Sequence, residues 1–284
     1  MKLIDGKETA RQIRAELKER TMLFEKKYGK KIGLDVVLVG EDPASQVYVR
    51  NKIKACEEVG IRSYSHYLPA NTAQKEVVEL VRALAVDNNV HGILVQLPLP
   101  KHLNAKEILA EIPAKKDADG FCAENVGKLT LNDESSTVSC TPYGVMELLK
   151  RYGVSLCGKN AVVVGRSNIV GRPMALLLLN ADATVTVCHS KTQELKDICA
   201  RADILVSAIG KAKFITADMV KEGAVVIDVG MNRDEEGHLC GDVDFESVKD
   251  KISLITPVPG GVGPMTIAML LQNTVALAER AELC

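Results

Sequence analysis

Ala161-Val-Val-Val-Gly-Arg-Ser-Asn-Ile-Val-Gly-Arg-Pro173 is the stretch of sequence that decides the fold. The apolar residues 161–164 are typical of a parallel strand covered on both faces, and Gly165 allows a sharp turn after it. A helix that begins after such a turn directs its free N–H groups toward a phosphate. The spacing departs from the usual G-x-G-x-x-G pattern, because Ser167 holds the second glycine position and Gly171 follows one residue late. The stretch therefore predicts a dinucleotide site with a variant turn.

The residues after the next expected strand, 184–188, indicate which dinucleotide binds. An NAD enzyme normally places Asp or Glu at this point to accept a hydrogen bond from the ribose. Here the chain continues His189-Ser-Lys-Thr192 instead. A hydroxyl and cationic side chains, together with Arg166 in the glycine turn, suit a 2′-phosphate. We therefore predict NADP as the cofactor; the alternative is that Arg166 and Lys191 are solvated loop charges.

Bulk properties indicate a globular protein with a small-molecule ligand. The chain has 284 residues, of which 46% are hydrophobic, enough for roughly two packed domains. Its net charge of −1 gives no electrostatic reason to expect nucleic acid or a membrane as a partner. No signal peptide or spanning segment is recognisable, so we expect a cytoplasmic location. The eight cysteines form no C-x-x-C pair, which predicts reduced thiols and no metal site.

Strands alternate with helices along the chain, which indicates βαβ units and parallel sheets. In the first half we expect helices at 7–28, 44–58, 73–85 and 105–109, and strands at 33–39, 61–68 and 92–95. In the second half we expect strands at 161–164, 184–188, 204–207 and 225–229. Thr141-Pro142 suits the start of a helix, because threonine is a favoured N-cap and proline a favoured first residue. The predicted fold class is α/β, with two α/β domains of which the second is Rossmann-like.

The apolar stretch 256–264 (Thr-Pro-Val-Pro-Gly-Gly-Val-Gly-Pro) predicts a loop, because its prolines lack the N–H donor and its glycines loosen the backbone. A long helix from Met265 to about Ala281 follows and can return to the first domain. We therefore assign residues 1–140 plus 265–284 to the first domain. Residues 141–264 form the second.

Tyr48 and Lys52 stand four residues apart within an expected helix, so both project from one face. A hydroxyl and an amine then lie side by side, although such a pair also arises by chance. The same spacing marks short-chain dehydrogenases, but there it follows the glycine turn. Here it precedes Gly165 by more than a hundred residues, which argues against that class.

Polar residues follow the strand 92–95, at the sheet edge where open α/β folds bind ligands. Gln96 is placed there with a neutral amide, and the loop Lys116-Asp-Ala-Asp119-Gly120 adds carboxylates at the same edge. The alternative for this loop is an ordinary acidic turn in which Asp119-Gly120 supplies the geometry.

Taken together, these segments closely resemble one family, the bifunctional methylenetetrahydrofolate dehydrogenase/methenyltetrahydrofolate cyclohydrolases. The resemblance covers nearly the entire chain. It is carried, in order, by Tyr48-x-x-x-Lys52, Val95-Gln96-Leu-Pro-Leu, Lys116-Asp-Ala-Asp119-Gly, Thr141-Pro, Val164-Gly-Arg-Ser-x-Ile-Val-Gly-x-Pro173, Cys188-His-Ser190, Ile227-Asp-Val-Gly-Met-Asn232 and Thr256-Pro-Val-Pro-Gly-Gly-Val-Gly-Pro-Met-Thr266.

This resemblance implies a folate cleft between the two domains and two reactions on the one-carbon bridge of reduced folate. NADP would take hydride from 5,10-methylenetetrahydrofolate to give the 5,10-methenyl cation, and water would then open the ring to 10-formyltetrahydrofolate. Lys52 would transfer protons in the hydrolysis, in a site that favours its neutral amine through burial and through the adjacent cationic substrate. Tyr48 would orient that amine, and Gln96 would hold it without adding a charge.

The resemblance also assigns the remaining contacts. Asp119 would accept two parallel N–H bonds from the pterin, beside the catalytic residues Lys52, Tyr48 and Gln96. The other substrate contacts implied are Leu97, Pro259, Gly260, Gly261 and Gly263. The cofactor contacts implied are Gly165, Arg166, Ser167, Ser190 and Met231.

The family further implies a homodimer formed through the nucleotide domain, and a place in one-carbon metabolism and purine biosynthesis. The sequence contains no P-loop pattern that would indicate an additional formate-activating ligase activity. Two alternatives stay open at this point: a dehydrogenase that has lost the hydrolysis, and a non-catalytic sensor of folate or NADP.

Overall fold

The computed structural model describes residues 1–283, which divide into two compact units. The first comprises Met1–Ala10 and Ser139–Thr266, and we call it the six-stranded unit. The second comprises Arg11–Val138 and the chain from Ile267 onward, and we call it the three-stranded unit. The chain passes from one unit to the other within two long helices, α1 (Gly6–Tyr28) and α10 (Val262–Ala281).

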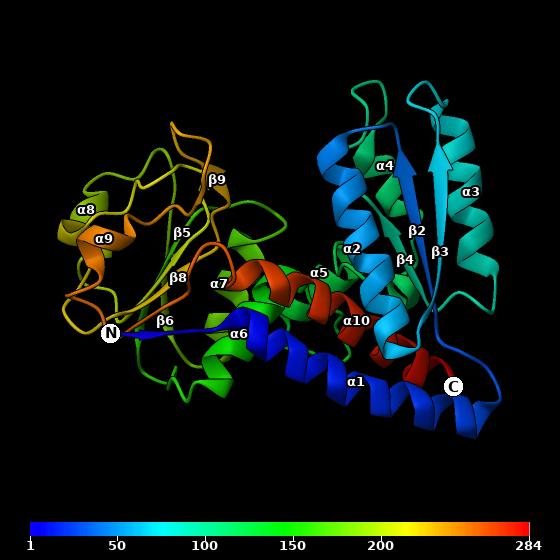
Figure 1. The fold of residues 1–284 in the computed structure, drawn as a ribbon, viewed down its shortest axis with the longest axis horizontal. Coiled ribbons are helices and arrows are strands. Elements are labelled where there is room, and N and C mark those ends of the chain that lie inside the picture. The colour runs from blue at the N-terminus through cyan, green and yellow to red at the C-terminus, as the bar shows by residue number, and fades with distance from the viewer. Residues whose placement is uncertain (284) are drawn as a thin grey trace. The chain divides into compact units, whose positions relative to one another are not determined.

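The three-stranded unit is built on a parallel sheet of order β3-β2-β4. Its strands are β2 (Gly33–Val39), β3 (Arg62–Leu68) and β4 (Gly92–Val95). Its other elements, besides most of α1 and α10, are α2 (Pro43–Val59), α3 (Gln74–Val86), α4 (Ala105–Ala110), the 3₁₀ turn η1 (Ala114–Lys116) and α5 (Ala123–Thr130). Figure 1 shows α2 and α3 on either side of this sheet.

The alternation of side chains along β2 explains how both faces of this sheet are covered. All seven residues of β2 are buried, so neither face is left to solvent. Val37 and Val39 pack in one apolar cluster with Val77 and Val81 of α3. Helix α2 contacts β2 and β3 as well. The central strand is thereby fixed, and its carboxyl end carries the chain into the loop before α2.

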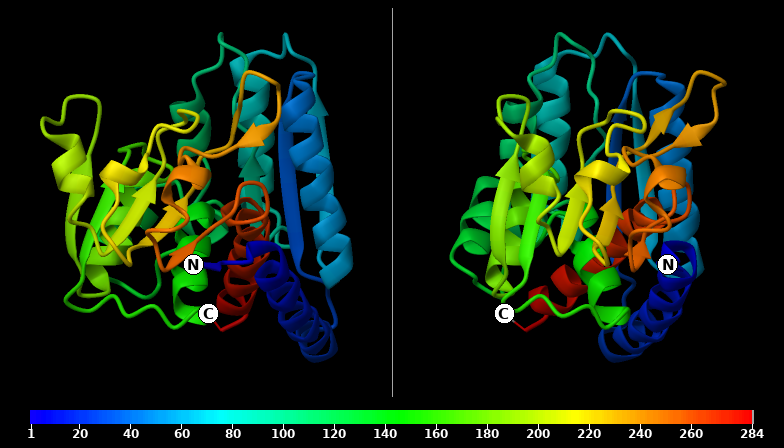
Figure 2. Two further views of the ribbon diagram at one scale, coloured as in Figure 1. Left: turned by 60° about the vertical axis from the view of Figure 1, so that its left-hand side comes forward. Right: turned by 90° about the vertical axis from the view of Figure 1, so that its left-hand side faces the viewer.

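The six-stranded unit contains a parallel sheet of order β1-β11-β8-β7-β5-β6. Its strands are β1 (Lys2–Leu3), β5 (Asn160–Val164), β6 (Thr184–Cys188), β7 (Ile204–Ser207), β8 (Val225–Asp228) and β11 (Leu254–Ile255). The remaining elements are α6 (Cys140–Arg151), α7 (Gly171–Asn180), α8 (Leu195–Cys199), η2 (Ala217–Met219), the hairpin of β9 (Asn232–Arg233) and β10 (Leu239–Cys240), and α9 (Phe245–Val248). Figure 2 shows the green-to-yellow strands of this sheet running side by side in one direction.

The stretch 161–164 forms the buried strand that its apolar residues predict. All four residues are at most 2% exposed, and the strand is flanked by β6 and β7. The two-domain α/β fold with a Rossmann-like second half is therefore confirmed.

The N-terminus differs from the expected domain division, which placed residues 1–140 in the first domain. Strand β1 pairs in parallel with β11, with Lys2 opposite Leu254 and Leu3 opposite Ile255. The first ten residues consequently belong to the six-stranded unit. A strand of only two residues has no periodicity, so the sequence carried no signal for this pairing.

Two helices begin earlier than predicted. Helix α6 starts at Cys140 with Ser139 in the N-cap position, so the expectation that Thr141 caps it is wrong. The Thr141 hydroxyl instead lies 2.9 Å from that of Thr266. Helix α10 starts at Val262, inside the stretch that was expected to be entirely irregular. Pro264 fits its first turn because the N–H groups there need no partner within the helix.

Within residues 1–283, no helix combines the length and the apolar composition needed to cross a membrane. The seven cysteines in this part of the chain have free thiols, and four of them are buried. Cys284 lies outside the described residues.

Candidate active site

Helix α2 places Tyr48 and Lys52 on one face of the three-stranded unit. The helix is started by Asp42, whose carboxylate accepts a hydrogen bond of 2.7 Å from the Ser45 amide, and by Pro43 in the first turn. Four residues make slightly more than one turn, so the two side chains lie one above the other. Tyr48 is 42% exposed and Lys52 is half-buried.

Gln96 extends from the carboxyl end of β4 and meets Lys52. Its backbone amide donates to the Val37 carbonyl (2.9 Å), so the residue continues the sheet for one more step. Its side-chain oxygen accepts from Lys52 Nζ at 3.0 Å, and its side-chain nitrogen donates to the Leu97 carbonyl at 2.6 Å. Because an ammonium can only donate and a carbonyl can only accept, these two partners fix the orientation of the amide.

The hydrogen-bond partner of Lys52 is a neutral amide. Among residues 1–283, no carboxylate forms an ion pair with its ammonium. One turn further along α2, burial raises the pKa of the Cys56 thiol to about 12, although the charge of Lys52 acts in the opposite direction. The thiol therefore stays neutral near pH 7, and the neutral Gln96 amide is the group that holds the amine.

The acidic loop after η1 contains two carboxylates, Asp117 and Asp119, which differ in burial and in hydrogen bonding. Asp117 is buried and accepts hydrogen bonds from the amides of Gly120 and Cys122 and from the Asn125 side chain. It therefore builds the turn itself. Asp119 remains half-buried. Asp117 pairs in parallel with Ile93 of β4, and Asp119 lies in the turn that directly follows this pairing.

Lys116, in the same loop, has a structural role. Its side chain is buried, and its ammonium donates to the carbonyls of Leu84 (3.2 Å) and Asp87 (2.6 Å) at the end of α3. Burial lowers the pKa of Lys116 from its usual value. The loop is thereby anchored to α3, which holds Asp119 at the edge of the sheet.

The proline- and glycine-rich stretch lies against the N-terminus of α1 in the six-stranded unit. The Lys7 amide donates to the Gly260 carbonyl (3.0 Å), and a Cβ at Gly6 would overlap the Gly261 carbonyl. The Val258–Pro259 peptide bond is cis. Pro259, Gly260 and Gly261 precede α10, whereas Gly263 lies in its first turn. Sequence reasoning did not identify Gly6, which is needed for this close approach.

The turn after β5 shows why glycine stands at two of its positions. Gly165 has a φ of +132°, and a Cβ on it would overlap the Ala208 carbonyl. A Cβ on Gly171 would overlap the carbonyl of Gly165. Ser167, at the second glycine position, accepts hydrogen bonds from the amides of Val170 (3.2 Å) and Gly171 (3.3 Å). It therefore caps α7 and takes two of the N–H groups that the sequence assigned to a phosphate.

The end of β6 brings a second exposed polar segment to this turn. In the sheet, Val164 lies opposite Cys188, so Arg166 and Ser190 each follow that pair by two residues. The side chains of Arg166 and Ser190 are exposed. The half-buried His189 has a partner within its own loop, because its Nδ1 accepts a hydrogen bond from the Lys191 amide at 3.1 Å. A guanidinium and a hydroxyl are thus presented from neighbouring strands.

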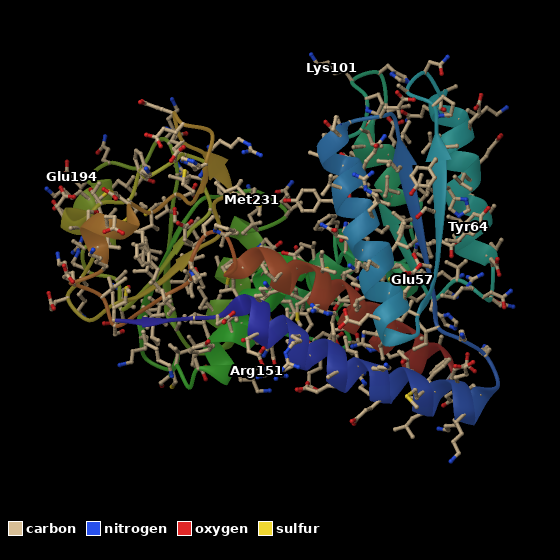
Figure 3. The ribbon with its side chains drawn as sticks, viewed as in Figure 1. Glu57, Tyr64, Lys101, Arg151, Glu194 and Met231 are labelled. Atoms are coloured by element: carbon tan, nitrogen blue, oxygen red, sulfur yellow. The ribbon has the colours of Figure 1, made fainter. Side chains whose placement is uncertain are left out.

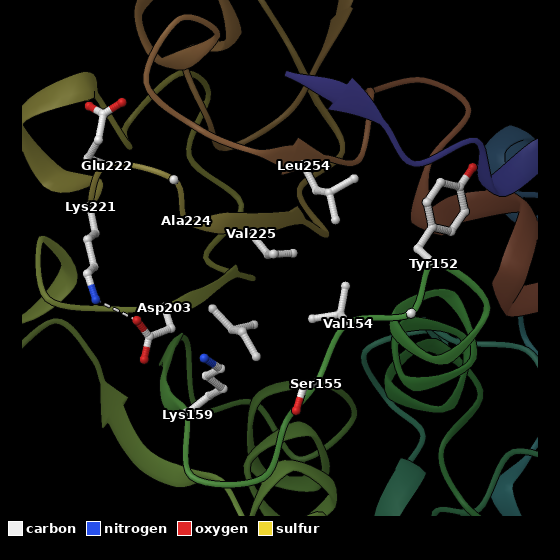
Figure 4. Close-up of a pocket in the computed structure, with 13 residues that line it drawn as sticks. Tyr152, Val154, Ser155, Lys159, Asp203, Lys221, Glu222, Ala224, Val225 and Leu254 are labelled. Atoms are coloured by element: carbon white, nitrogen blue, oxygen red, sulfur yellow. Dashed lines mark hydrogen bonds and ion pairs between the residues drawn. The ribbon is translucent and has the colours of Figure 1, made fainter.

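Two cavities of the six-stranded unit lie at opposite edges of its sheet. One of about 300 Å³ is at the amino edge, where Ile204, Val225 and Leu254 begin their strands (Figure 4). None of the predicted site residues lines it. The other, of about 270 Å³, is at the carboxyl edge and is lined by Asp228 at the end of β8 and by Thr256 and Pro257 beyond β11. Met231, labelled in Figure 3, lies on the loop after β8 and is 51% exposed.

The predicted site residues fall into two groups. The structure brings Lys52 and Gln96 into direct contact, with Tyr48 on the same helix as Lys52 and Asp119 in the loop after η1, all in the three-stranded unit. The residues of the proline-glycine stretch and of the glycine turn, with Ser190 and Met231, belong to the six-stranded unit. Sequence reasoning missed two buried carboxylates there, Asp228 and Asp242.

Two family models match the chain. Residues 4–119 match the catalytic domain of the tetrahydrofolate dehydrogenase/cyclohydrolases, and residues 139–282 match their NAD(P)-binding domain.

Individual relatives match over almost the whole chain. The bifunctional protein FolD of Campylobacter curvus is 58% identical over 98% of this chain and 96% of its own, and that of Moorella thermoacetica is 58% identical over 98% and 99%. The crystal structure of the FolD enzyme of Campylobacter jejuni superposes with a TM-score of 0.97 at 54% identity, covering 99% of both chains. The Trypanosoma brucei enzyme, solved with NADP and an inhibitor, superposes with a TM-score of 0.94 at 43% identity, covering 99% of this chain and 98% of its own.

Proposed function

The chain belongs to the tetrahydrofolate dehydrogenase/cyclohydrolase family, and from this premise we propose which of its side chains carry out the two reactions. It is a bifunctional enzyme. It oxidises 5,10-methylenetetrahydrofolate to the 5,10-methenyl form with NADP, and it hydrolyses that product to 10-formyltetrahydrofolate.

Lys52 is the proton-transfer group of the hydrolysis. Water must lose a proton as it adds to the methenyl carbon, and the ring nitrogen must gain one as its bond to that carbon breaks. In its neutral form, Lys52 Nζ accepts the first proton, and the ammonium so formed supplies the second, while the proton of the carbinol hydroxyl is released to solvent. One proton is released overall, as the conversion of a cation to a neutral formyl group requires.

The observation that carries this role is the 3.0 Å hydrogen bond between Lys52 and the neutral amide of Gln96. A carboxylate at that point would favour the ammonium, and an apolar side chain would leave the amine free to rotate. The amide orients the amine and adds no charge. Tyr48, on the same helix face, completes the group by packing against the folate and orienting the amine.

The remaining substrate contacts are proposed from the family. Asp119 binds the pterin, because its carboxylate is half-buried, lies in the turn directly after the Asp117–Ile93 pairing and can accept two parallel N–H bonds. Leu97, Pro259, Gly260, Gly261 and Gly263 bind the rest of the folate. Asp117 is buried, and its carboxylate accepts hydrogen bonds from within its own loop. We therefore assign it the role of holding the loop that carries Asp119, and no contact with the folate.

The carboxyl edge of the six-stranded sheet fits NADP. The glycine turn has no room for side chains at Gly165 and Gly171, and Arg166 and Ser190 supply a cation and a hydroxyl suited to a phosphomonoester. Ser167 and Met231 complete the proposed cofactor contacts. When bound, NADP accepts the hydride, and the side chains of this chain bind and orient it.

The test is to measure the two reactions separately in Lys52→Ala, with Lys54→Ala as the matched control on an exposed position of the same helix. Loss of general acid–base catalysis lowers the hydrolysis rate by roughly 100- to 10,000-fold. We expect this loss in Lys52→Ala, with NADP binding retained and Lys54→Ala active. Unchanged hydrolysis in Lys52→Ala would contradict the proton-transfer role. If the wild-type protein catalyses the oxidation but not the hydrolysis, it is the dehydrogenase that has lost the hydrolysis.

We also propose a homodimer formed through the six-stranded unit. Its strand β6 is at the end of the sheet order, and Val187 on this strand is 39% exposed. Unpaired strand edges are ready to pair with another chain. Light scattering should give a mass twice the 30.7 kDa of the chain. Val187→Lys should lower the measured mass to that of the monomer, whereas the control Val86→Lys, at another exposed valine, should leave it unchanged. A monomeric wild-type protein would refute this.

We place the enzyme in the cytoplasm and its product in purine biosynthesis. The free thiols of the seven described cysteines suit a reducing compartment. The net charge of −1 supports neither nucleic acid nor a membrane surface as a partner. Expression in a host that lacks this activity should restore growth without added purine, and a continued purine requirement would contradict the role.

A further inference from the structure

One buried carboxylate connects two loops at the carboxyl edge of the six-stranded sheet. Asp242 is fully buried. It accepts hydrogen bonds from the three consecutive backbone amides of residues 209–211, at 2.8, 3.3 and 2.9 Å, and from the Ser207 hydroxyl at 3.2 Å. It also accepts from the side-chain amide of Asn232 at 2.9 Å. The first four donors end or follow β7, and Asn232 is the first residue of β9, directly after the loop that follows β8.

The backbone around this carboxylate is fitted to it closely. A Cβ on Gly230 would overlap the carboxylate of Asp242, so the loop that carries Met231 lies directly against it. A second buried carboxylate, Asp228, accepts from the amides of Asp242 (2.9 Å) and Val243 (2.8 Å). A Cβ on Gly241 would overlap Asp228 in turn. Asp242 is therefore itself held in place, and cannot shift without moving both loops.

The position of these loops relates them to one half of the cofactor. In a Rossmann-like sheet the dinucleotide extends along the carboxyl edge, with the glycine turn of the first strand at its pyrophosphate. Here that strand is β5, and β6 lies on the side where the adenosine phosphate is recognised. Strands β7 and β8 lie on the other side of β5, so the loops after them border the nicotinamide half.

We propose that Asp242 is a positioning residue for hydride transfer, which binds the loops 208–211 and 229–232 to each other and so fixes the surface that carries the nicotinamide. The proposal rests on the NADP-dependent function proposed above. It assigns Asp242 no contact with the cofactor. A carboxylate suits the position because it accepts on both oxygens, whereas an amide of the same size would turn an N–H group toward N–H donors.

The experiment compares Asp242→Asn with Asp244→Asn, a half-buried aspartate two residues further on. We expect hydride transfer in Asp242→Asn to lose about tenfold to a hundredfold in kcat, on the scale of one or two charge-assisted hydrogen bonds. Hydrolysis of methenyltetrahydrofolate, which needs no NADP, should change less than about threefold. Asp244→Asn should leave both rates near those of the wild type.

A second readout does not depend on turnover. Hydrogen exchange of the amides 209–211 should become faster in Asp242→Asn, and a titration of NADPH fluorescence should show weaker binding. Wild-type exchange at these amides together with wild-type oxidation would overturn the proposal. Equal loss of both activities with unchanged NADPH affinity would also overturn it, because the effect would then not be specific to the cofactor loops.

A variant with a milder change covers the case in which Asp242→Asn does not fold. Asn232→Ala removes only the donor at the start of β9, and it should give a smaller fall in kcat with faster exchange at residues 229–232. No change in either would overturn the proposal. If the wild type shows no NADP-dependent oxidation, the proposed function fails instead, and the exchange and NADPH titration still decide the role of Asp242.

Discussion

The Gln96 side chain holds Lys52 by its amide oxygen at 3.0 Å while its amide nitrogen donates to the Leu97 carbonyl at 2.6 Å. One residue thus joins the helix that carries the amine to the end of β4. The contact is between a cation and a neutral dipole. A charged group at position 96 would therefore act directly on the Lys52 side chain.

Gln96→Glu changes that charge with almost no change in shape. A carboxylate beside Lys52 favours the ammonium, so the neutral amine forms only at higher pH. We expect the pH–rate profile of hydrolysis to move to the alkaline side and the rate near pH 7 to fall by about tenfold or more. Gln193→Glu, on an exposed loop of the other unit, is the control and should leave the profile unchanged. An unshifted profile in Gln96→Glu would show that Lys52 does not set the rate.

Arg166→Ala tests the phosphate site. Arg166 and Ser190 each follow the Val164–Cys188 pair by two residues, and we propose that both bind the 2′-phosphate. Hydrogen bonds to charged groups contribute about 1.5–3 kcal/mol, and each 1.4 kcal/mol is a factor of ten. We expect the KM for NADP to rise roughly tenfold to a hundredfold, and the KM for NAD to change much less. Arg201→Ala, at an exposed position after α8, should change neither value. An equal rise with both cofactors would assign Arg166 to the pyrophosphate.

The fold was predictable where one apolar run makes one element. The strands 33–39, 92–95, 184–188 and 204–207 begin and end at the predicted residues. Three of them, β2, β4 and β7, are buried and mostly apolar, whereas β6 is the partly exposed edge strand, in which threonine alternates with valine. The helical spacing placed Tyr48 and Lys52 on one helix face, and the strand end placed Gln96 at the edge of the sheet; both are local features of the sequence. The contact between Lys52 and Gln96 joins two elements 44 residues apart, and only the family resemblance implied it.

The features that the sequence did not predict depend on contacts between distant residues. Strand β1 exists because Lys2 and Leu3 pair with residues 254–255. Asp242 accepts hydrogen bonds from backbone amides more than thirty residues away in the sequence. The local sequence Gly241-Asp242 is also typical of an ordinary turn, so it did not indicate this role. Ser167 is similar, because its part in capping α7 depends on the path of the turn.

Two glycine substitutions in helices should have opposite effects. Gly171 is the first residue of α7, and a methyl group there would overlap the Gly165 carbonyl. A methyl group on Gly127, in α5, would meet nothing within 4 Å beyond its own stretch of helix. Alanine is favoured over glycine within helices by roughly 0.5–1 kcal/mol, whereas overpacking costs about 1–3 kcal/mol. Calorimetry should therefore show a lower Tm for Gly171→Ala and a slightly higher one for Gly127→Ala. A stable Gly171→Ala that binds NADP normally would contradict the role of Gly171 in the turn.

Asp228 should make stability depend on pH in a direction unusual for a carboxylate. Burial raises its pKa from 3.8 to about 6, against the effect of the backbone amides that donate to it. Between these values the folded protein holds a proton that the unfolded chain has released, so its stability falls as pH rises from about 4 to about 6. At 1.36 kcal/mol per pKa unit, the loss is up to about 3 kcal/mol. Asp228→Asn removes this titration, although the amide also weakens the hydrogen bonds. The stability of the wild type relative to Asp228→Asn, measured by urea unfolding, should therefore decrease as the pH rises through this window. A constant difference between the wild type and Asp228→Asn would show that Asp228 is already ionised at pH 4.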